Sequence, residues 1–119
     1  MGLDQYAYRR KKGASKKNME EISYWRKHNR LHGWMENRWR KRKGEEVDHS
    51  NFNCVQFRLK EDDIFALLRD ISSNNLPETE GFFFGDDSEG IYNKEDYEFC
   101  IMALDSISKG YKIYYDSWW

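Results

Sequence analysis

Residues 23–39 read SYWRKHNRLHGWMENRW, which sets three tryptophans, a tyrosine and two histidines among arginines and a lysine. The spacing of apolar residues from Met19 to about Trp39 predicts a helix, with Asn18 as its cap and Glu21 completing a capping box. On a helical wheel, most of the aromatic side chains lie on one continuous arc and most of the cations lie on the other side. We therefore expect the aromatic side chains mainly to pack a core.

Two features of this segment do not fit a simple core helix. Trp34 is the one tryptophan that the wheel places among the cations. Polar side chains also form a row at the margin of the packed arc, at positions i, i+4, i+7 and i+11, which are Trp25, Asn29, His32 and Glu36. Such groups need hydrogen-bond partners when they are covered. The row either bonds to the backbone of a neighbouring strand or loop, or it lines a binding site, and the sequence leaves both open.

Segments with strand and helix patterns surround the predicted helix. The further predicted elements are strands over 3–10, 54–59, 82–84 and 111–119, and helices over 61–71 and 93–110. Residues 40–51, RKRKGEEVDHSN, predict an exposed charged loop. The order β-α-β-α-β-α-β predicts an α+β (or small α/β) fold, a single domain over 1–119 in which helices pack against one small sheet.

Composition excludes several classes of protein. Aromatic residues make up 17% of the 119 residues, which is too many for a disordered chain. A mean hydropathy of -1.04 and the lack of a long apolar run argue against a membrane protein. Two cysteines, Cys54 and Cys100, are too few and too far apart for a disulfide framework or a zinc site, so we expect reduced, small core residues in a cytoplasmic protein.

Charge is distributed unevenly along the chain. Residues 1–44 hold 14 Lys and Arg against 4 Asp and Glu, whereas residues 45–119 hold 6 against 17. One explanation is a nucleic-acid or charged-protein partner, and the other is that the two halves neutralise each other within the fold. The basic half contains cations for phosphate and aromatic rings for stacking, so nucleic-acid binding is a third-ranked function.

Catalysis has little support in the sequence. His32 and Glu36 are one helical turn apart and would suit an acid–base pair. No nucleophile elbow, phosphate loop or metal-ligand spacing accompanies them. We therefore expect a protein that is not an enzyme and that needs no cofactor or metal.

Four segments, MGLDQYAYRR, YWRKHNRLHGW, LPETEGFFFG and YYDSWW, resemble in this order a family of small uncharacterised proteins encoded by bacteriophages and prophages. That family typically opens MGLD-x-Y, carries YWRK-x-N-x-x-H-x-W and LP-x-x-x-GFFFG, and ends in a tyrosine-rich strand closing on S-x-W or S-W. The resemblance spans the chain, and the RKRKGEEVDHS and GDDSEG loops depart from the pattern. The ligand-binding residues that we take from the motifs and the wheel are Tyr24, Trp25, Arg26, Lys27, Asn29, His32, Phe83, Phe84, Ser117 and Trp118.

The resemblance implies a phage origin and no particular reaction. We expect a non-enzymatic accessory protein that acts in the cytoplasm of the infected cell. Its partner would be a host ligand, such as a signalling nucleotide, or a host defence or metabolic protein, and a homo-oligomer is compatible with this. We expect the pocket between the first helix, the GFFFG turn and the final strand, where Arg26 or Lys27 would meet an anionic group. The alternatives are an inhibitor that binds a host nucleic-acid-processing enzyme, or direct nucleic-acid binding through the basic half.

Overall fold

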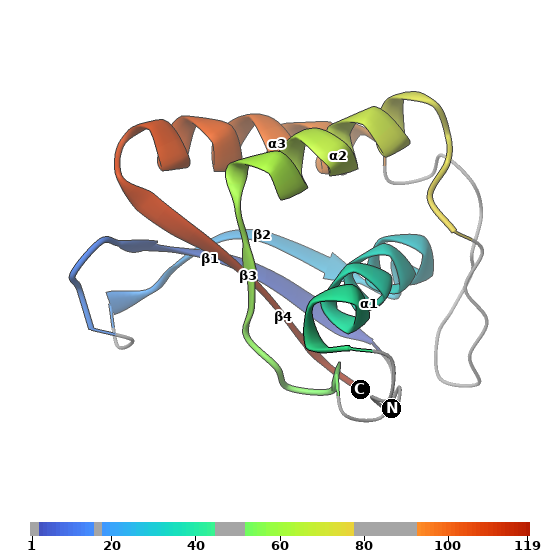
Figure 1. The fold of residues 1–119 in the computed structure, drawn as a ribbon, viewed down its shortest axis with the longest axis horizontal. Coiled ribbons are helices and arrows are strands. Elements are labelled where there is room, and N and C mark those ends of the chain that lie inside the picture. The colour runs from blue at the N-terminus through green and yellow to red at the C-terminus, as the bar shows by residue number, and fades with distance from the viewer. Residues whose placement is uncertain (1–2, 16–17, 45–51, 78–92) are drawn as a thin grey trace.

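A four-stranded antiparallel sheet and three helices make up the computed structural model, which describes residues 3–15, 18–44, 52–77 and 93–119 (Figure 1). The order along the chain is β1 (Asp4–Lys11), β2 (Glu20–Arg26), α1 (Asn29–Lys43), β3 (Phe57–Leu59), α2 (Glu61–Ser72), α3 (Asn93–Ser108) and β4 (Tyr111–Trp118). In the sheet the strands follow the order β2-β1-β4-β3, and each neighbouring pair is antiparallel. The first and last strands of the chain therefore lie side by side at the centre of the sheet.

Alternation along the central strands separates the sheet into two faces. On β1 and just before it, Leu3, Gln5 and Ala7 are fully buried, while the residues between them are partly exposed. On β4, Ile113 and Tyr115 are buried in the same way. Successive side chains of a strand point to opposite sides, so these residues share one face, which we call the covered face.

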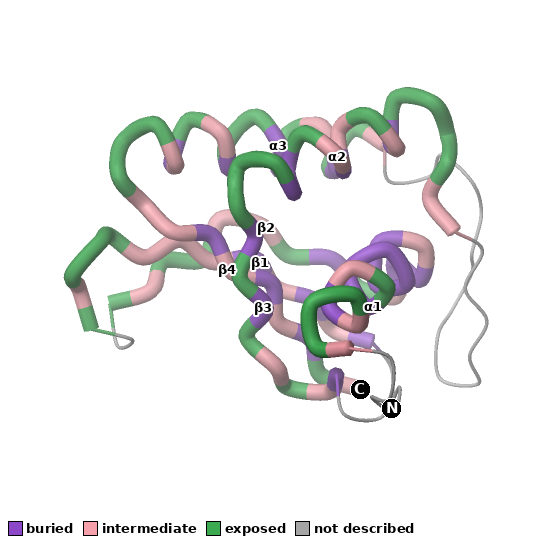
Figure 2. The backbone as a smooth tube through the Cα atoms, in the orientation of Figure 1, coloured by how far each residue is buried: buried purple, intermediate pink, exposed green. Residues whose placement is uncertain are grey.

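The helices pack against the covered face. Figure 1 shows α2 and α3 lying together above the sheet, and Figure 2 shows their exposed residues on the outer side and buried residues toward the sheet. The Trp25 ring of β2 meets Phe99 of α3 edge-on, with centroids 5.1 Å apart. From α1, Trp39 packs on Phe52, 4.9 Å between centroids, and Phe52 stacks on Tyr115 of β4. One aromatic core thus joins all of these elements.

The sequence predicted most of these elements. The α+β class with one small sheet is confirmed, as are a first strand near 3–10, helices near 61–71 and 93–110, and a final strand near 111–119. The predicted strand over 54–59 shortens to Phe57–Leu59. Cys54 instead lies in a turn with a φ of 61°. The predicted strand over 82–84 lies outside the described residues.

The single helix predicted from Met19 to Trp39 is wrong. Glu20–Arg26 is a strand paired with β1, and α1 begins only at Asn29. The chain turns between the two at Lys27, whose φ of 58° is left-handed and so ends the strand. The predicted cap at Asn18 is wrong for the same reason, since the residue that precedes α1 is His28. The observed order is therefore β-β-α-β-α-α-β rather than strict alternation.

Two smaller expectations also change. The helix α1 runs to Lys43, so residues 40–43 of the predicted loop are helical, and residues 45–51 lie outside the described residues. Of the two cysteines, Cys100 is buried as expected, and burial raises the pKa of its thiol to about 12. Cys54 is exposed and is therefore not a core residue. No helix within the described ranges has the length and apolar character needed to cross a membrane.

Candidate functional site

A buried polar network joins β2, α1 and α3. The Nε2 atom of His28 lies 2.8 Å from Oδ2 of Asp96, and the indole of Trp25 donates to Oδ1 of the same carboxylate at 3.1 Å. His28 and Asp96 are 5% and 1% exposed. A buried carboxylate is stable only when it is paired and hydrogen-bonded. Asp96 therefore ties the start of α3 to the junction between β2 and α1.

Gln5 extends this network into the centre of the sheet. Its Oε1 accepts a hydrogen bond from the backbone N–H of His28 at 2.8 Å, and its Nε2 donates to the His28 carbonyl at 3.1 Å. The same Nε2 donates to the hydroxyl of Tyr115 at 3.1 Å, and that hydroxyl lies 2.8 Å from Nδ1 of His32. Burial raises the pKa of Tyr115, so its hydroxyl stays protonated. The network holds the sharp turn between β2 and α1 in place.

The polar row predicted from the sequence belongs to this interior. Trp25, Asn29, His32 and Glu36 are all at most 8% exposed, although Trp25 lies on a strand and the other three on a helix. His32 is fully buried beside Phe52 and Tyr115, and Glu36 forms an ion pair with Arg40 at 3.1 Å. Trp25, His32 and Glu36 therefore each have a side-chain partner within the fold.

Of the predicted site residues that the structure describes, Tyr24 and Trp25 line one small pocket of about 220 Å³ between β2 and α3, and the others do not line it. Trp25, Asn29, His32 and Ser117 are buried, whereas Tyr24, Arg26 and Trp118 are exposed. Neighbouring residues of a strand point to opposite faces, and for this reason Ser117 and Trp118 are separated. Lys27 occupies the turn after β2, where its backbone N–H donates to the Leu3 carbonyl at 2.7 Å. Phe83, Phe84 and the GFFFG turn lie outside the described residues, and so does the pocket expected beside them.

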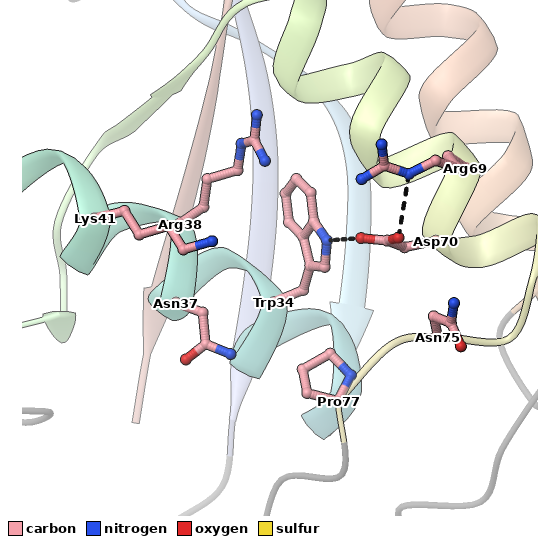
Figure 3. Close-up of a pocket in the computed structure, with 8 residues that line it drawn as sticks. All are labelled: Trp34, Asn37, Arg38, Lys41, Arg69, Asp70, Asn75 and Pro77. Carbon is pink, nitrogen blue, oxygen red and sulfur yellow. Dashed lines mark hydrogen bonds and ion pairs between the residues drawn. The ribbon is translucent and has the colours of Figure 1, made fainter.

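A different pocket, of about 270 Å³, opens between α1 and the end of α2 (Figure 3). Its lining comes from one side of α1 and from the last turn of α2 with the segment that follows it. The lining residues are Trp34, Asn37, Arg38, Lys41, Arg69, Asp70, Asn75 and Pro77. Except for Trp34 and Pro77, all of these side chains are polar or charged, so the pocket suits a hydrated, charged ligand rather than an apolar one.

Trp34 forms the inner wall of this pocket. The wheel placed it on the cationic, solvated side, but it is only 7% exposed. Its indole donates to Oδ2 of Asp70 at 2.8 Å, and the guanidinium of Arg38 lies over its ring, 5.3 Å from the centroid. A cation over an aromatic face is attracted by the ring quadrupole. Trp34 and Arg38 therefore hold each other at the pocket wall, as Figure 3 shows.

The lining carries an excess of positive charge. Three cations, Arg38, Lys41 and Arg69, stand against one carboxylate, Asp70. Asp70 already accepts the indole hydrogen bond, and Nε of Arg69 lies 3.6 Å from its other oxygen. Arg38 also pairs with Asp63. Lys41 is exposed and forms no ion pair within the described residues, so it is the cation best placed to meet a ligand anion.

Apart from Trp34, which belongs to the YWRK-x-N-x-x-H-x-W motif, none of the residues that line this pocket was predicted from the sequence as a site residue. The helical wheel did carry a signal, because it set Trp34 apart from the other tryptophans and among the cations of α1. It could not reveal the contribution of α2, because Asp70 is 36 residues from Trp34 along the chain. Among the described residues, no group of three or more His, Cys, Asp or Glu side chains is placed to hold a metal ion.

Comparison of the chain with protein-family models, with curated proteins and with solved structures found no match in any of the three.

Proposed function

We propose that this is a phage-encoded accessory protein without catalytic activity, which binds a small phosphorylated ligand of the host, such as a signalling nucleotide, in the pocket beside Trp34. The ligand class follows from the charge of the lining, where Arg38, Lys41 and Arg69 outnumber Asp70. Guanidinium and ammonium groups are the usual protein partners of phosphate. The phage origin and a cytoplasmic site of action rest on the motif resemblance.

Size and polarity support the same ligand class. At about 270 Å³ the pocket is slightly smaller than the usual small-ligand sites, which begin at roughly 300 Å³. It would hold a phosphate with its sugar, or a small nucleotide that projects partly into solvent. The side-chain amides of Asn37 and Asn75 can donate and accept hydrogen bonds, which suits sugar hydroxyls or a base edge.

The positions of the acid–base candidates support binding rather than catalysis. His32 lies in the buried network with its Nδ1 beside the Tyr115 hydroxyl, and Glu36 pairs with Arg40. Neither His32 nor Glu36 lines the pocket. A general acid or base must reach the proton that it transfers, within about 3 Å or through one water molecule. A ligand in this pocket would therefore be bound without help from the two groups that could have acted on it.

Calorimetric titration with ATP, cyclic AMP, cyclic di-GMP and inorganic phosphate tests this proposal. We expect at least one nucleotide to bind, and the Lys41→Ala and Arg69→Ala variants to weaken that binding about tenfold or more, because each removes a charged contact. Lys43→Ala is the matched control, since Lys43 is an exposed cation on the same helix that does not line the pocket.

Mass spectrometry of small molecules released by denaturing the purified protein extends the search to ligands that copurify. If none of the four probes binds and no phosphorylated molecule is released, the proposal is wrong. It is equally wrong if a nucleotide binds and the two pocket variants retain wild-type affinity.

A further inference from the structure

The sheet has a second face, opposite the helices. On β1, the side chains of Tyr6, Tyr8 and Arg10 alternate with the buried ones and are partly exposed. In the described part of the chain, α2 and α3 lie on the other side of the sheet, and α1 meets the covered face through the contact of His32 with Tyr115 (Figure 1). We call this second surface the open face, and its central residues are Tyr6, Tyr8, Arg10, Tyr24, Lys112 and Tyr114.

Aromatic rings run across the open face. Tyr6 and Tyr8 are stacked, with centroids 6.0 Å apart and planes 20° from parallel. Tyr24 of β2 continues the row, 5.2 Å from Tyr6. On the other side of β1, Tyr114 of β4 lies directly opposite Tyr8 in the antiparallel register. Four tyrosines from three strands thus form one surface with aromatic rings that are partly exposed.

Cations gather at one end of this surface. Arg10 and Lys112 are directly opposite each other on β1 and β4, and Arg58 of β3 is opposite Tyr114. Arg10 donates to the Tyr114 hydroxyl at 2.8 Å, with its guanidinium 5.2 Å from the ring centroid. Like charges directly across a sheet destabilise it. In the described part of the chain, none of these three cations forms an ion pair with a carboxylate, so a bound anion would relieve their repulsion.

Carboxylates lie at the other end and beside the tyrosines. Asp4 is opposite Trp118 and accepts a hydrogen bond from Tyr24 at 2.7 Å, and Arg26 lies 4.0 Å from it. Asp116 is opposite Tyr6. Glu21 of β2 is directly opposite Tyr8, so carboxylates also lie beside the tyrosine rings, and the basic part of the open face is the cluster of Arg10, Lys112 and Arg58. An anionic ligand would bind over the basic end and extend onto the rings.

We propose that the open face binds single-stranded nucleic acid. Phosphates contact Arg10, Lys112 and Arg58, and unpaired bases stack on Tyr8 and Tyr6. Single strands are bound without sequence preference by this combination of a cationic track and exposed rings, because every base has a face that can stack. Double-stranded nucleic acid fits this face less well, because its bases are paired and stacked on each other. An acidic protein segment would pair with the cations but would bring no flat rings to stack on the tyrosines. This site is separate from the pocket beside Trp34.

Fluorescence anisotropy with labelled (dT)12 and (rU)12 at low salt tests the assignment. We expect Tyr8→Leu to weaken binding at least about fivefold, because it keeps an apolar strand residue and removes the stacking ring. We expect Lys112→Gln to weaken binding and to reduce the slope of log K against log salt by about 0.7, the value for one phosphate contact on a single strand. Matched controls are Tyr97→Leu on α3 and Lys109→Gln in the turn before β4, which should bind like the wild type.

The assignment is overturned if the wild-type protein binds neither oligonucleotide, or if the two controls lose as much affinity as the open-face variants. It is also overturned if a labelled duplex or polyglutamate binds as tightly as (dT)12, since the face would then recognise charge alone or a protein. Pocket variants Lys41→Ala and Arg69→Ala should leave oligonucleotide binding unchanged, which separates this result from that of the nucleotide titration. Thermal melts of each variant check that the fold is intact.

Discussion

The two faces of the sheet are built from the same strands and differ in almost every property. On the covered face, Gln5, Trp25 and Tyr115 are buried, and each makes specific hydrogen bonds to other buried groups. On the open face, Tyr8 of β1 and Tyr114 of β4 are partly exposed. Because successive strand residues point to opposite sides, one strand supplies both surfaces. Stability can therefore depend on one set of residues and recognition on the other.

Replacing a tryptophan on each face should give the largest contrast. Trp25→Ala is expected to lower the free energy of unfolding by about 3–5 kcal/mol. The change opens a cavity beside Phe99 and removes the hydrogen bond that the indole donates to Asp96. Trp118→Ala, at a position that is 64% exposed, should change it by no more than about 0.5 kcal/mol. Urea unfolding measures both variants. Equal losses would mean that burial does not distinguish the two faces.

Ion pairs on buried and exposed sites give the next contrast. His28→Ala leaves the Asp96 carboxylate buried with only the Trp25 indole as a side-chain partner among the described residues, and we expect a loss of about 3 kcal/mol. Glu20→Gln breaks the surface pair with Arg9 at a side chain that is 60% exposed, and the loss should be below about 1 kcal/mol. Urea unfolding at constant pH compares the two variants. If His28→Ala costs no more than Glu20→Gln, the buried network is not what holds α1 against the sheet.

Neighbouring tyrosines on β4 sharpen the comparison further. Tyr115→Phe removes the hydroxyl that joins Gln5 and His32, which leaves buried polar groups with fewer partners, and should cost about 1–3 kcal/mol. Tyr114→Phe removes a partly exposed hydroxyl that accepts from Arg10, and should cost less than about 1 kcal/mol. Thermal unfolding of both variants checks the order. The reverse order would place the important hydrogen bonds on the open face.

The smallest expected effect is that of Asp116 on the open face. Partial burial raises the pKa of its carboxyl, so the folded protein holds this proton more tightly than the unfolded chain. Its contribution to stability should therefore fall as pH rises from the ordinary carboxyl value, near about 4, through the raised one. Asp116→Asn should remove this decline and gain roughly a few tenths of a kcal/mol at neutral pH, after allowance for solvent screening. Unfolding curves from acid to neutral pH test it, and a variant that keeps the wild-type pH dependence would contradict the prediction.

Local patterns predicted the elements whose environment is simple. Period-two alternation in LDQYAYRR matched β1, the tyrosine-rich last nine residues matched β4, and the apolar spacing of EDDIFALLRDI matched α2. The same reasoning failed for Glu20–Arg26. The helical wheel places Trp25 on the buried side, and Trp25 is also buried in the observed strand, so its burial does not distinguish a helix from a strand. Pairing with β1 decided between them, and that pairing joins residues about 20 positions apart, as in the bond from Tyr24 to Asp4.

The candidate sites depended even more on distant parts of the chain. The pocket beside Trp34 needs Arg69 and Asp70 from α2, and the cationic end of the open face joins Arg10 to Lys112 and Arg58. The sequence did identify Trp25, Asn29 and His32 as a group apart, but it left open whether they form a site or support the fold. All three are buried, Trp25 bonds to Asp96, and His32 lies beside Phe52 and Tyr115.

What the sequence determined by itself was the class of the fold, the two central strands and the last two helices, because short-range periodicity and burial are encoded in neighbouring residues. Only the tertiary structure decided which face of each strand is covered and where the strand of residues 20–26 ends and α1 begins. It also decided which cations lie close together in the two candidate sites. Those features depend on contacts between residues far apart in the chain, such as Trp25 with Asp96 and Trp34 with Asp70, whose energies no local pattern contains.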